Sequence, residues 1–306
     1  MNSSSTRFSL TDINVVRAIG TLCIGVISII CNALALVLIR TTTSLRTPCF
    51  QFIGGSVAGA LVAGLFYGIA SINHLGKVTG IINPIRTRFQ CLLIHGTTGI
   101  CGLAFHSFMT CLIGLDRLLS LLAPTKYRHF GKWYVFIGIS LCASVAVAEE
   151  AAILIVTPRD ELMDCVTFSK AGREDAMTAY ITLNLCSGVA SVVIYIAMVC
   201  CFYRKRAKYR VGSSEYKIFM KQQASVMPTV ILLAVLAFVC SVTPEVMFDI
   251  IMRLDPHTVA FSVSNTVANF LKCSSSMMEF IALTDVCKPN ELCELTISAI
   301  WACCSA

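Results

Sequence analysis

Seven long apolar stretches follow one another along the chain, separated by charged or polar segments. A helix needs about 20 mostly apolar residues to cross a hydrocarbon core of ~30 Å, and each stretch reaches that length. The pattern therefore predicts an all-α membrane protein, a seven-transmembrane helix bundle. The predicted spans are Val15 to Ile39, Phe50 to Ile72, Cys91 to Leu115, Trp133 to Val156, Ala176 to Tyr203, Val226 to Ile251 and Thr258 to Thr284.

The two ends of the chain lie outside this predicted bundle. Residues 1–14 are polar and predict an extracellular N-terminus, and residues 15–284 hold the spans. Residues 285–306 predict a cytoplasmic tail in which apolar residues recur with helical period, as in a short interfacial helix lying along the membrane. The seventh stretch carries charged residues, so six spans with an embedded or peripheral seventh is the alternative.

Composition supports a membrane protein and argues against other classes. Of the 306 residues, 56% are hydrophobic and 13% are charged, whereas ordinary soluble domains have about 25% charged residues. The net charge of +7 is distributed between apolar spans, not gathered on one face, so no nucleic-acid partner is expected. Most of the 17 cysteines lie within apolar runs, where cysteine acts as a small hydrophobic residue.

The distribution of basic residues predicts the orientation in the membrane. Lys and Arg are retained on the cytoplasmic side of short loops, and the densest basic run is YRKRAKYR at residues 203–210. The loop at residues 158–175 is rich in Asp and Glu. We therefore expect a multi-pass protein of the plasma membrane with its N-terminus extracellular and its C-terminus cytoplasmic. Asn2 would then be a candidate glycosylation site.

An adjacent acid and base stand at the cytoplasmic end of the third predicted span, Asp116 and Arg117. A guanidinium can pair with a neighbouring carboxylate and later exchange it for another partner, which makes such a pair a possible switch. The simpler interpretation is an interfacial pair that only anchors the helix, and the pair alone favours that interpretation.

The surrounding spacing resembles the rhodopsin-like G-protein-coupled receptors. Their Asp-Arg-Tyr, Pro, Tyr pattern is matched by Asp116, Arg117, Pro124 and Tyr127, with Leu118 as the departure. Three further features agree in order and place with that superfamily: Asn32 in the first span, Leu45-Arg46-Thr47-Pro48 in the first loop, and Pro244 in the sixth span.

Within that superfamily the segment GLDRLLSLLAP, the many cysteines and the short third loop look most like the nematode serpentine chemoreceptors of the Srsx type. The resemblance implies a chemosensory receptor that binds an extracellular ligand and activates a heterotrimeric G protein. It also implies a disulfide between Cys91 and Cys165. Pro244 would act as a hinge, because an interior proline removes a helix hydrogen bond and kinks the span.

Some positions depart from the superfamily pattern. Ala60 stands where most members carry an aspartate in the second span, so no sodium-type ion site is expected. The seventh span lacks the usual Asn-Pro and Tyr residues and has Glu279 in that region. A receptor-like protein that no longer signals is therefore one alternative function.

Ionisable residues inside the spans are the candidates for ligand contact, because charge within a membrane is costly and needs a partner. The candidates are Glu149, Glu245, Lys272 and His106. For Glu149 a position at the headgroup level is the simpler interpretation, and for His106 a packed or hydrogen-bonded core position. Lys272 lies in the wrong register for an opsin-type retinal lysine, and a pairing with Glu245 is the alternative.

No enzyme, cofactor or metal motif is present: the sequence has no zinc spacing, phosphate-binding glycine loop or nucleophile elbow. A small transporter or channel is the rival class, and it predicts internal repeats or glycine-broken half-helices. The second span is rich in glycine, without a matching half elsewhere. Cys303 and Cys304 are candidates for acylation.

Overall fold

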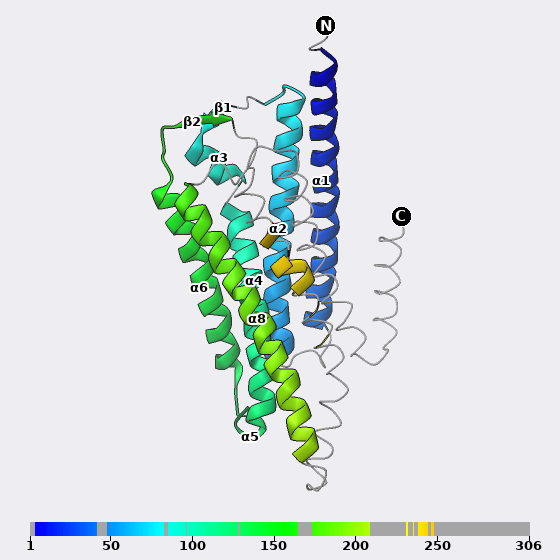
Figure 1. The fold of residues 1–306 in the computed structure, drawn as a ribbon, viewed down its shortest axis with the longest axis vertical. Coiled ribbons are helices and arrows are strands. Elements are labelled where there is room, and N and C mark those ends of the chain that lie inside the picture. The colour runs from blue at the N-terminus through cyan, green and yellow to red at the C-terminus, as the bar shows by residue number, and fades with distance from the viewer. Residues whose placement is uncertain are drawn as a thin grey trace.

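The computed structural model is a bundle of long helices that run side by side along its longest axis (Figure 1). The predicted spans one to five fall within the part of the chain that the structure describes, whereas the seventh span and the tail lie outside it. The described residues are 4–41, 48–82, 85–95, 97–127, 129–164, 173–208, 231, 235, 238–243 and 246–247.

Within this part of the chain, five helices are long and apolar enough to cross a membrane. Each overlaps one of the first five predicted spans, which confirms a helical membrane protein up to that point. The helices are α1 (Ser4–Thr41), α2 (Pro48–Val78), α4 (Thr97–Leu122), α6 (Lys132–Val156) and α8 (Glu174–Lys208).

The third predicted span is wrong in its bounds. A single helix was expected from Cys91 to Leu115, but the structure has a short helix α3 (Arg88–His95) followed by α4. Gly96, which stands between them in the sequence, lies outside the described residues. The membrane-crossing part begins at Gly99 and continues to Leu122, so Asp116 and Arg117 lie within the helix and not at its end.

Proline and glycine set several helix ends. Pro48 occupies the first position of α2, where its missing N–H costs no hydrogen bond. After α2 the chain turns at Gly80, whose positive φ of 75° suits glycine. Pro124 opens the four-residue helix α5 (Pro124–Tyr127), and α4 ends just before it because a residue preceding proline disfavours helical backbone.

The other helices are longer than their predicted spans. Helix α1 begins at Ser4, so most of the segment expected as a separate N-terminus continues the first helix. Helix α8 continues to Lys208, beyond the predicted end at Tyr203. Charged and polar residues end an apolar run, but they do not end a helix, and hydropathy alone therefore underestimates helix length.

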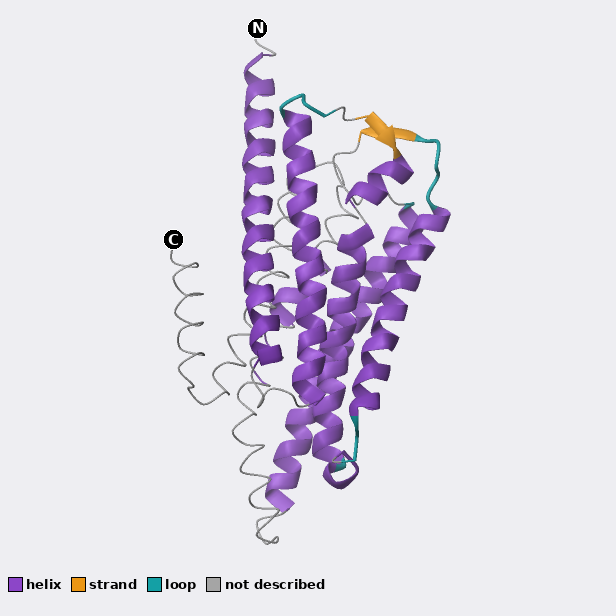
Figure 2. Ribbon diagram, turned by 180° about the vertical axis from the view of Figure 1, so that it is seen from behind, coloured by secondary structure: helices purple, strands orange, loops and turns teal. Residues whose placement is uncertain are grey.

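A small antiparallel pair of strands lies at the end of the bundle that also holds the N-terminus (Figure 2). Strand β1 (Ile85–Thr87) pairs with β2 (Leu162–Asp164), with Ile85 opposite Asp164. The strands connect the loop before α3 to the loop after α6. Arg88 and Glu161 add an ion pair of 3.2 Å beside them.

Helix α2 packs closely against two neighbours through glycine. A Cβ added at Gly25 of α1 would lie 2.9 Å from the Gly68 nitrogen, and one at Gly102 of α4 would lie 2.8 Å from the Ala63 nitrogen. Close approach of this kind is typical of membrane helices. In lipid the hydrophobic effect does not drive helices together, and small residues let their backbones approach closely enough for van der Waals packing. Helix α2 is continuous through its glycines, so they do not form the half-helices that a transporter would predict.

The outer surface of the bundle is apolar. Ile69 of α2, Leu141 and Ile155 of α6, and Val193 of α8 are all more than half exposed. In water such a surface would be a site of aggregation, but facing lipid tails it costs nothing. The buried core lies between the helices, with Phe52, Val57 and Met109 among its most enclosed side chains.

A short π-helix, η2 (Phe238–Val242), lies in the sixth predicted span and packs against α8. The hydroxyl of Thr243 donates a hydrogen bond to the Phe238 carbonyl at 3.0 Å. π-Turns mark places where a helix bends. This departure from α geometry directly precedes Pro244, which itself lies outside the described residues.

Candidate activation site where α4 meets α5

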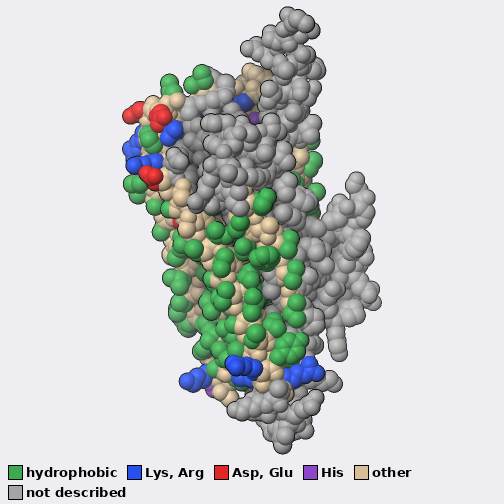
Figure 3. Space-filling model, viewed as in Figure 1, with side chains coloured by type: hydrophobic (Ala, Val, Ile, Leu, Met, Phe, Trp, Pro, Cys, Tyr) green, Lys and Arg blue, Asp and Glu red, His purple; other side chains and the backbone are tan. Residues whose placement is uncertain are grey.

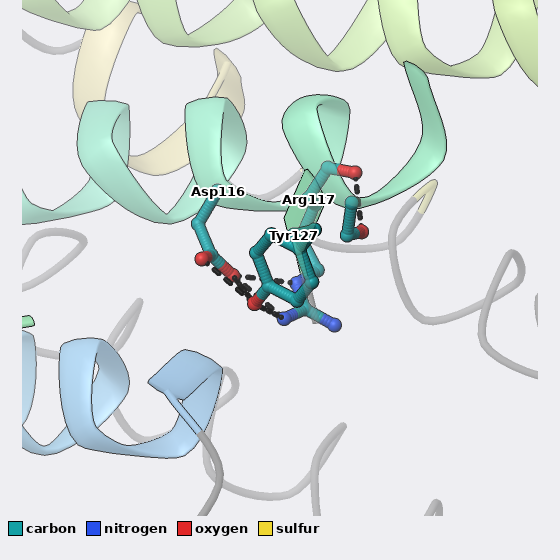
Figure 4. A network of polar contacts seen from close by, with 4 residues as sticks. Asp116, Arg117 and Tyr127 are labelled. Atoms are coloured by element: carbon teal, nitrogen blue, oxygen red, sulfur yellow. Dashed lines mark hydrogen bonds and ion pairs between the residues drawn. The ribbon is translucent and has the colours of Figure 1, made fainter. Parts of the chain in front are cut away.

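Asp116 and Arg117 form a close ion pair on the last part of α4 (Figure 4). Arg117 donates through Nη2 to Asp116 Oδ2 at 2.6 Å and through Nε to the same oxygen at 3.0 Å. The Asp116 side chain is fully buried, whereas that of Arg117 retains 22% exposure. The carboxylate is thus enclosed, and the guanidinium lies at the edge of the protein.

Tyr127 completes the network from α5. Its hydroxyl donates to Asp116, with 2.9 Å to Oδ1 and 3.1 Å to Oδ2, and accepts from Arg117 Nη2 at 3.0 Å. Burial raises the pKa of Tyr127 above its usual value, although Arg117 acts in the opposite direction. The phenol therefore keeps its proton and remains a donor.

Pro124 explains why Tyr127 can reach the pair. The proline starts the turn of α5 directly after α4, and this turn brings the tyrosine back beside the helix it has just left. The structure thereby brings together four of the five residues predicted for the activation switch. The fifth, Pro244, is outside the described residues.

Two further residues hold this end of α4 in place. Ser120 donates to the Arg117 carbonyl at 2.7 Å. Lys205 of α8 donates through Nζ to the carbonyls of Leu121 and Leu122, at 2.7 and 3.2 Å. These carbonyls have no partner within the helix, and a cation at a helix C-terminus also interacts favourably with its dipole.

Lys205 was not predicted as a site residue, although it lies in the basic run that indicated the orientation. No local spacing relates a residue on α8 to a helix end more than eighty residues earlier. The only available indication was chemical, since the last carbonyls of any helix need donors.

Basic side chains gather at this end of the bundle. On the face shown in Figure 3, Lys and Arg form a band at the end opposite the N-terminus, while acidic and basic side chains mix at the N-terminal end. Arg204, Lys205 and Arg206 of α8 belong to the basic end. The site therefore lies within a positively charged surface.

The predicted structural motif is only partly described. Asn32 is buried with 1% exposure on α1 and donates to the Ser28 carbonyl and hydroxyl at 2.7 and 3.1 Å. Pro48 opens α2, as described above, and Arg46 lies outside the described residues. Ala60, in place of an acid, is buried on α2.

His106 is a hydrogen-bonded core residue in the structure. Its Nδ1 lies 2.8 Å from the Ser56 hydroxyl and 3.2 Å from the Ser56 carbonyl, and the side chain is 6% exposed. It thus ties α4 to α2. The bonds fit the packed interpretation of His106 better than ligand contact.

Glu149 and Glu150 lie in the half of α6 nearest β2, away from the Asp116 network. Both carboxylate oxygens of Glu149 are closed off from water and have no hydrogen-bond partner among the described residues. Its side chain lines a cavity between α6 and α8. Glu245 and Lys272, the other two candidates for ligand contact, lie outside the described residues.

Cys91 lies on α3 and is disulfide-bonded. The predicted partner, Cys165, is outside the described residues, so the pairing remains a prediction. Metal ligands were not expected, and no group of three His, Cys, Asp or Glu side chains suited to a metal ion occurs in the described ranges.

Fold and site together define a multi-pass helical membrane protein with a buried ion pair at its basic end. The chain belongs to the family described as serpentine type 7TM GPCR chemoreceptor Srsx, whose model matches residues 25–285. The predicted resemblance is confirmed. The family is a class of receptors, not of enzymes. A search of curated proteins found no match.

Proposed function

We propose that this protein is a chemosensory receptor that binds an extracellular ligand and activates a heterotrimeric G protein through the end of the bundle where α4 meets α5. The observation that carries the proposal is the closed network of Asp116, Arg117 and Tyr127 within a basic surface. Membership of the chemoreceptor family supports the role of the protein as a whole.

Arg117 is the residue that would change partners. A guanidinium presents several donors in a planar fork and can move from one acceptor to another without losing its charge. Asp116 and Tyr127 occupy its Nε and Nη2 donors in the structure. Its remaining exposure places it where a G protein could supply carbonyl or carboxylate acceptors.

Ligand binding would act on this network by shifting a packing equilibrium. The π-turn of η2 supports a bend in the sixth span at Pro244, and η2 packs against α8. Helix α8 in turn holds the end of α4 through Lys205. A swing of the sixth span could therefore reach Arg117 through α8.

The orientation follows from the same proposal. The basic end would face the cytoplasm, where positively charged loops are retained, and the end with the N-terminus would face outside. The pairing of Cys91 with Cys165 fits this arrangement. Asp164, just before Cys165, pairs with Ile85 on the strand that leads into the helix of Cys91, and the outer compartment is oxidising.

A nucleotide-exchange assay without ligand tests the proposal. The receptor would be reconstituted in nanodiscs with purified heterotrimeric G proteins and compared with Asp116→Asn, Arg117→Ala and the double variant. We expect Asp116→Asn to raise basal exchange several-fold, because Arg117 loses its charged partner. The double variant should return to the level of Arg117→Ala.

The matched control is Lys126→Ala, which removes one exposed cation beside Tyr127. It should leave basal exchange near that of the wild type. Equal exchange in all variants, or a gain in Asp116→Asn that survives the loss of Arg117, would remove Arg117 from the mechanism.

A further inference from the structure

A cavity of about 350 Å³ lies between α6 and α8, at the end of the bundle that holds β1 and β2. Ile153 and Val156 of α6 face Ala179, Tyr180 and Leu183 of α8 across it. Its walls are mostly apolar, and Glu149, Arg173 and Asp175 are its charged lining residues. The volume falls in the range of small-molecule sites, which combine apolar walls with few polar groups.

Glu149 is the acidic residue of α6 that lines this cavity. It precedes the end of α6 by two helical turns, or about 10 Å. Neither of its carboxylate oxygens has a hydrogen-bond partner among the described residues, and both are closed off from water. An ionised carboxylate is stable in such surroundings only with a partner of opposite charge or a hydrogen-bond donor.

The adjacent residue, Glu150, has a different environment. Its carboxyl group lies near the thiol of Cys101 on α4, and it is not among the residues that line the cavity. Two other charged residues line the cavity, Arg173 and Asp175, and they form an ion pair with each other at 3.2 Å. Arg173 therefore pairs with its neighbour, and it gives Glu149 no hydrogen bond in the structure.

We propose that the cavity between α6 and α8 is a binding site for an amphiphilic ammonium compound, whose N–H groups bind the Glu149 carboxylate and whose apolar body fills the space between Ile153, Tyr180 and Leu183. An ammonium supplies both the charge and the donors that Glu149 lacks, and an apolar body matches the walls. In this bound state the Glu149 side chain turns so that its oxygens face the cavity.

The inference names a ligand class for the proposed receptor, and it rests on the proposed function only for the consequence of binding. The same chemistry could come from a soluble amine or from the headgroup of an aminolipid. Both sources present an N–H-bearing cation attached to an apolar body, and the experiment separates them.

The test measures thermal unfolding of the full-length receptor in phosphatidylglycerol nanodiscs, which contain no amine. Hexylamine is the probe, and 1-hexanol is the uncharged compound of the same length. A ligand that binds the folded state raises the unfolding midpoint with concentration. We expect a saturable rise with hexylamine but not with hexanol, and an apparent Kd at least tenfold weaker in Glu149→Gln.

Glu150→Gln is the matched control, because it removes the adjacent carboxylate outside the cavity, and it should respond as the wild type does. Ala179→Phe places a ring in the cavity from α8 without changing any charge and should weaken the response to hexylamine. Equal responses in the wild type and Glu149→Gln, or no response in the wild type, would overturn the proposal.

A second set of nanodiscs containing phosphatidylethanolamine identifies the source. If that lipid raises the midpoint of the wild type but not of Glu149→Gln, and hexylamine adds nothing, the occupant is the headgroup. If hexylamine still acts as before, the occupant is a soluble amine. No G protein is present, so this result is independent of the nucleotide-exchange result.

Discussion

Asp116 and Glu149 are both acidic residues on helices that cross the membrane, but they differ in whether the described part of the chain supplies hydrogen-bond partners for them. Asp116 receives hydrogen bonds from Arg117 and Tyr127 and has no exposed side-chain surface. Glu149 has oxygens that are equally closed off from water, yet no partner for them occurs in the described part of the chain.

The difference separates two uses of buried charge. A carboxylate whose partners come from its own chain holds one arrangement of helices, because removing either partner leaves a buried charge without compensation. A carboxylate without such partners lowers the stability of the folded protein unless something binds to it. Substitutions at the two sites should therefore change stability in opposite directions.

The largest effect is expected for Asp116→Ala. The substitution leaves the Arg117 guanidinium without its charged partner, and breaking a buried pair in this way costs about 3–5 kcal/mol. Arg117 keeps some exposure to solvent, so we expect the lower part of this range, about 3 kcal/mol. Thermal unfolding in nanodiscs, followed by the reaction of buried thiols such as Cys49 and Cys142 with a fluorescent reagent, would measure it.

Asp160→Ala is the control for that substitution, because it removes an exposed acid at the other end of the bundle. It should leave the unfolding midpoint almost unchanged. Similar midpoints for the two variants would show that the Asp116 pair does not stabilise the folded protein.

The network around Asp116 could be predicted from the sequence, and the surroundings of Glu149 only in part. The spacing of Asp116, Arg117, Pro124 and Tyr127 is local, since a short turn connects the helix that holds the pair to the tyrosine. Local spacing determines local geometry: Asp116, Arg117 and Tyr127 meet in one network, and Pro124 opens the turn that brings the tyrosine there.

Glu149 could be named but not interpreted from the sequence. Its lack of a partner depends on how α6 rotates against α4 and α8, and two adjacent acids look alike in a sequence. The rotation sends Glu150 toward Cys101 and leaves Glu149 at the cavity. His106 is a similar case, because its partner Ser56 lies fifty residues away on another helix.

Helix positions were predicted well and helix ends less well. Hydropathy located α6 to within one residue, since Lys132 and Thr157 flank a long run that is apolar except for a few residues such as Glu149 and Glu150. It missed the separation of α3 from α4, because apolar residues continue on both sides of Gly96. It also gave no indication of β1 and β2, whose pairing joins segments far apart in the chain.

Tyr127→Phe should have the next largest effect. The change removes only the hydroxyl, which donates to the buried carboxylate and accepts from Arg117. A hydrogen bond to a charged group contributes about 1.5–3 kcal/mol, and because the ion pair itself remains we expect a loss of about 1.5 kcal/mol. The same unfolding assay would measure it.

A double variant sharpens this second prediction. If Tyr127 acts through the carboxylate, adding Tyr127→Phe to Asp116→Ala should cost much less than adding it to the wild type. Additive losses would show instead that Tyr127 stabilises the protein through its ring contacts, such as that with Phe130.

Glu149→Leu should change stability in the opposite direction. The apolar side chain has a similar length and removes a carboxylate that lacks partners, so we expect a gain of about 1 kcal/mol in the absence of any amine. The gain is modest because the side chain as a whole is only partly buried. A loss of stability would show that Glu149 has a partner after all, and the contrast with Asp116 would then fail.

Lys205→Met should have the smallest effect of the four. The residue closes the helix end next to the Asp116 network by donating to the carbonyls of Leu121 and Leu122. Methionine keeps most of the aliphatic chain but neither the charge nor the donor. A cation at a helix C-terminus contributes about 0.3–1 kcal/mol, so we expect a loss of about 0.5 kcal/mol.

Arg204→Met is the control, because it removes the same charge from an exposed neighbour on α8, and it should cost less. If both variants lose the same amount, the general charge of the basic end stabilises the protein, and the specific bonds from Lys205 do not. If only Lys205→Met lowers the midpoint, the hydrogen bonds from Lys205 of α8 to the carbonyls at the end of α4 stabilise the protein, as the bonds around Asp116 do.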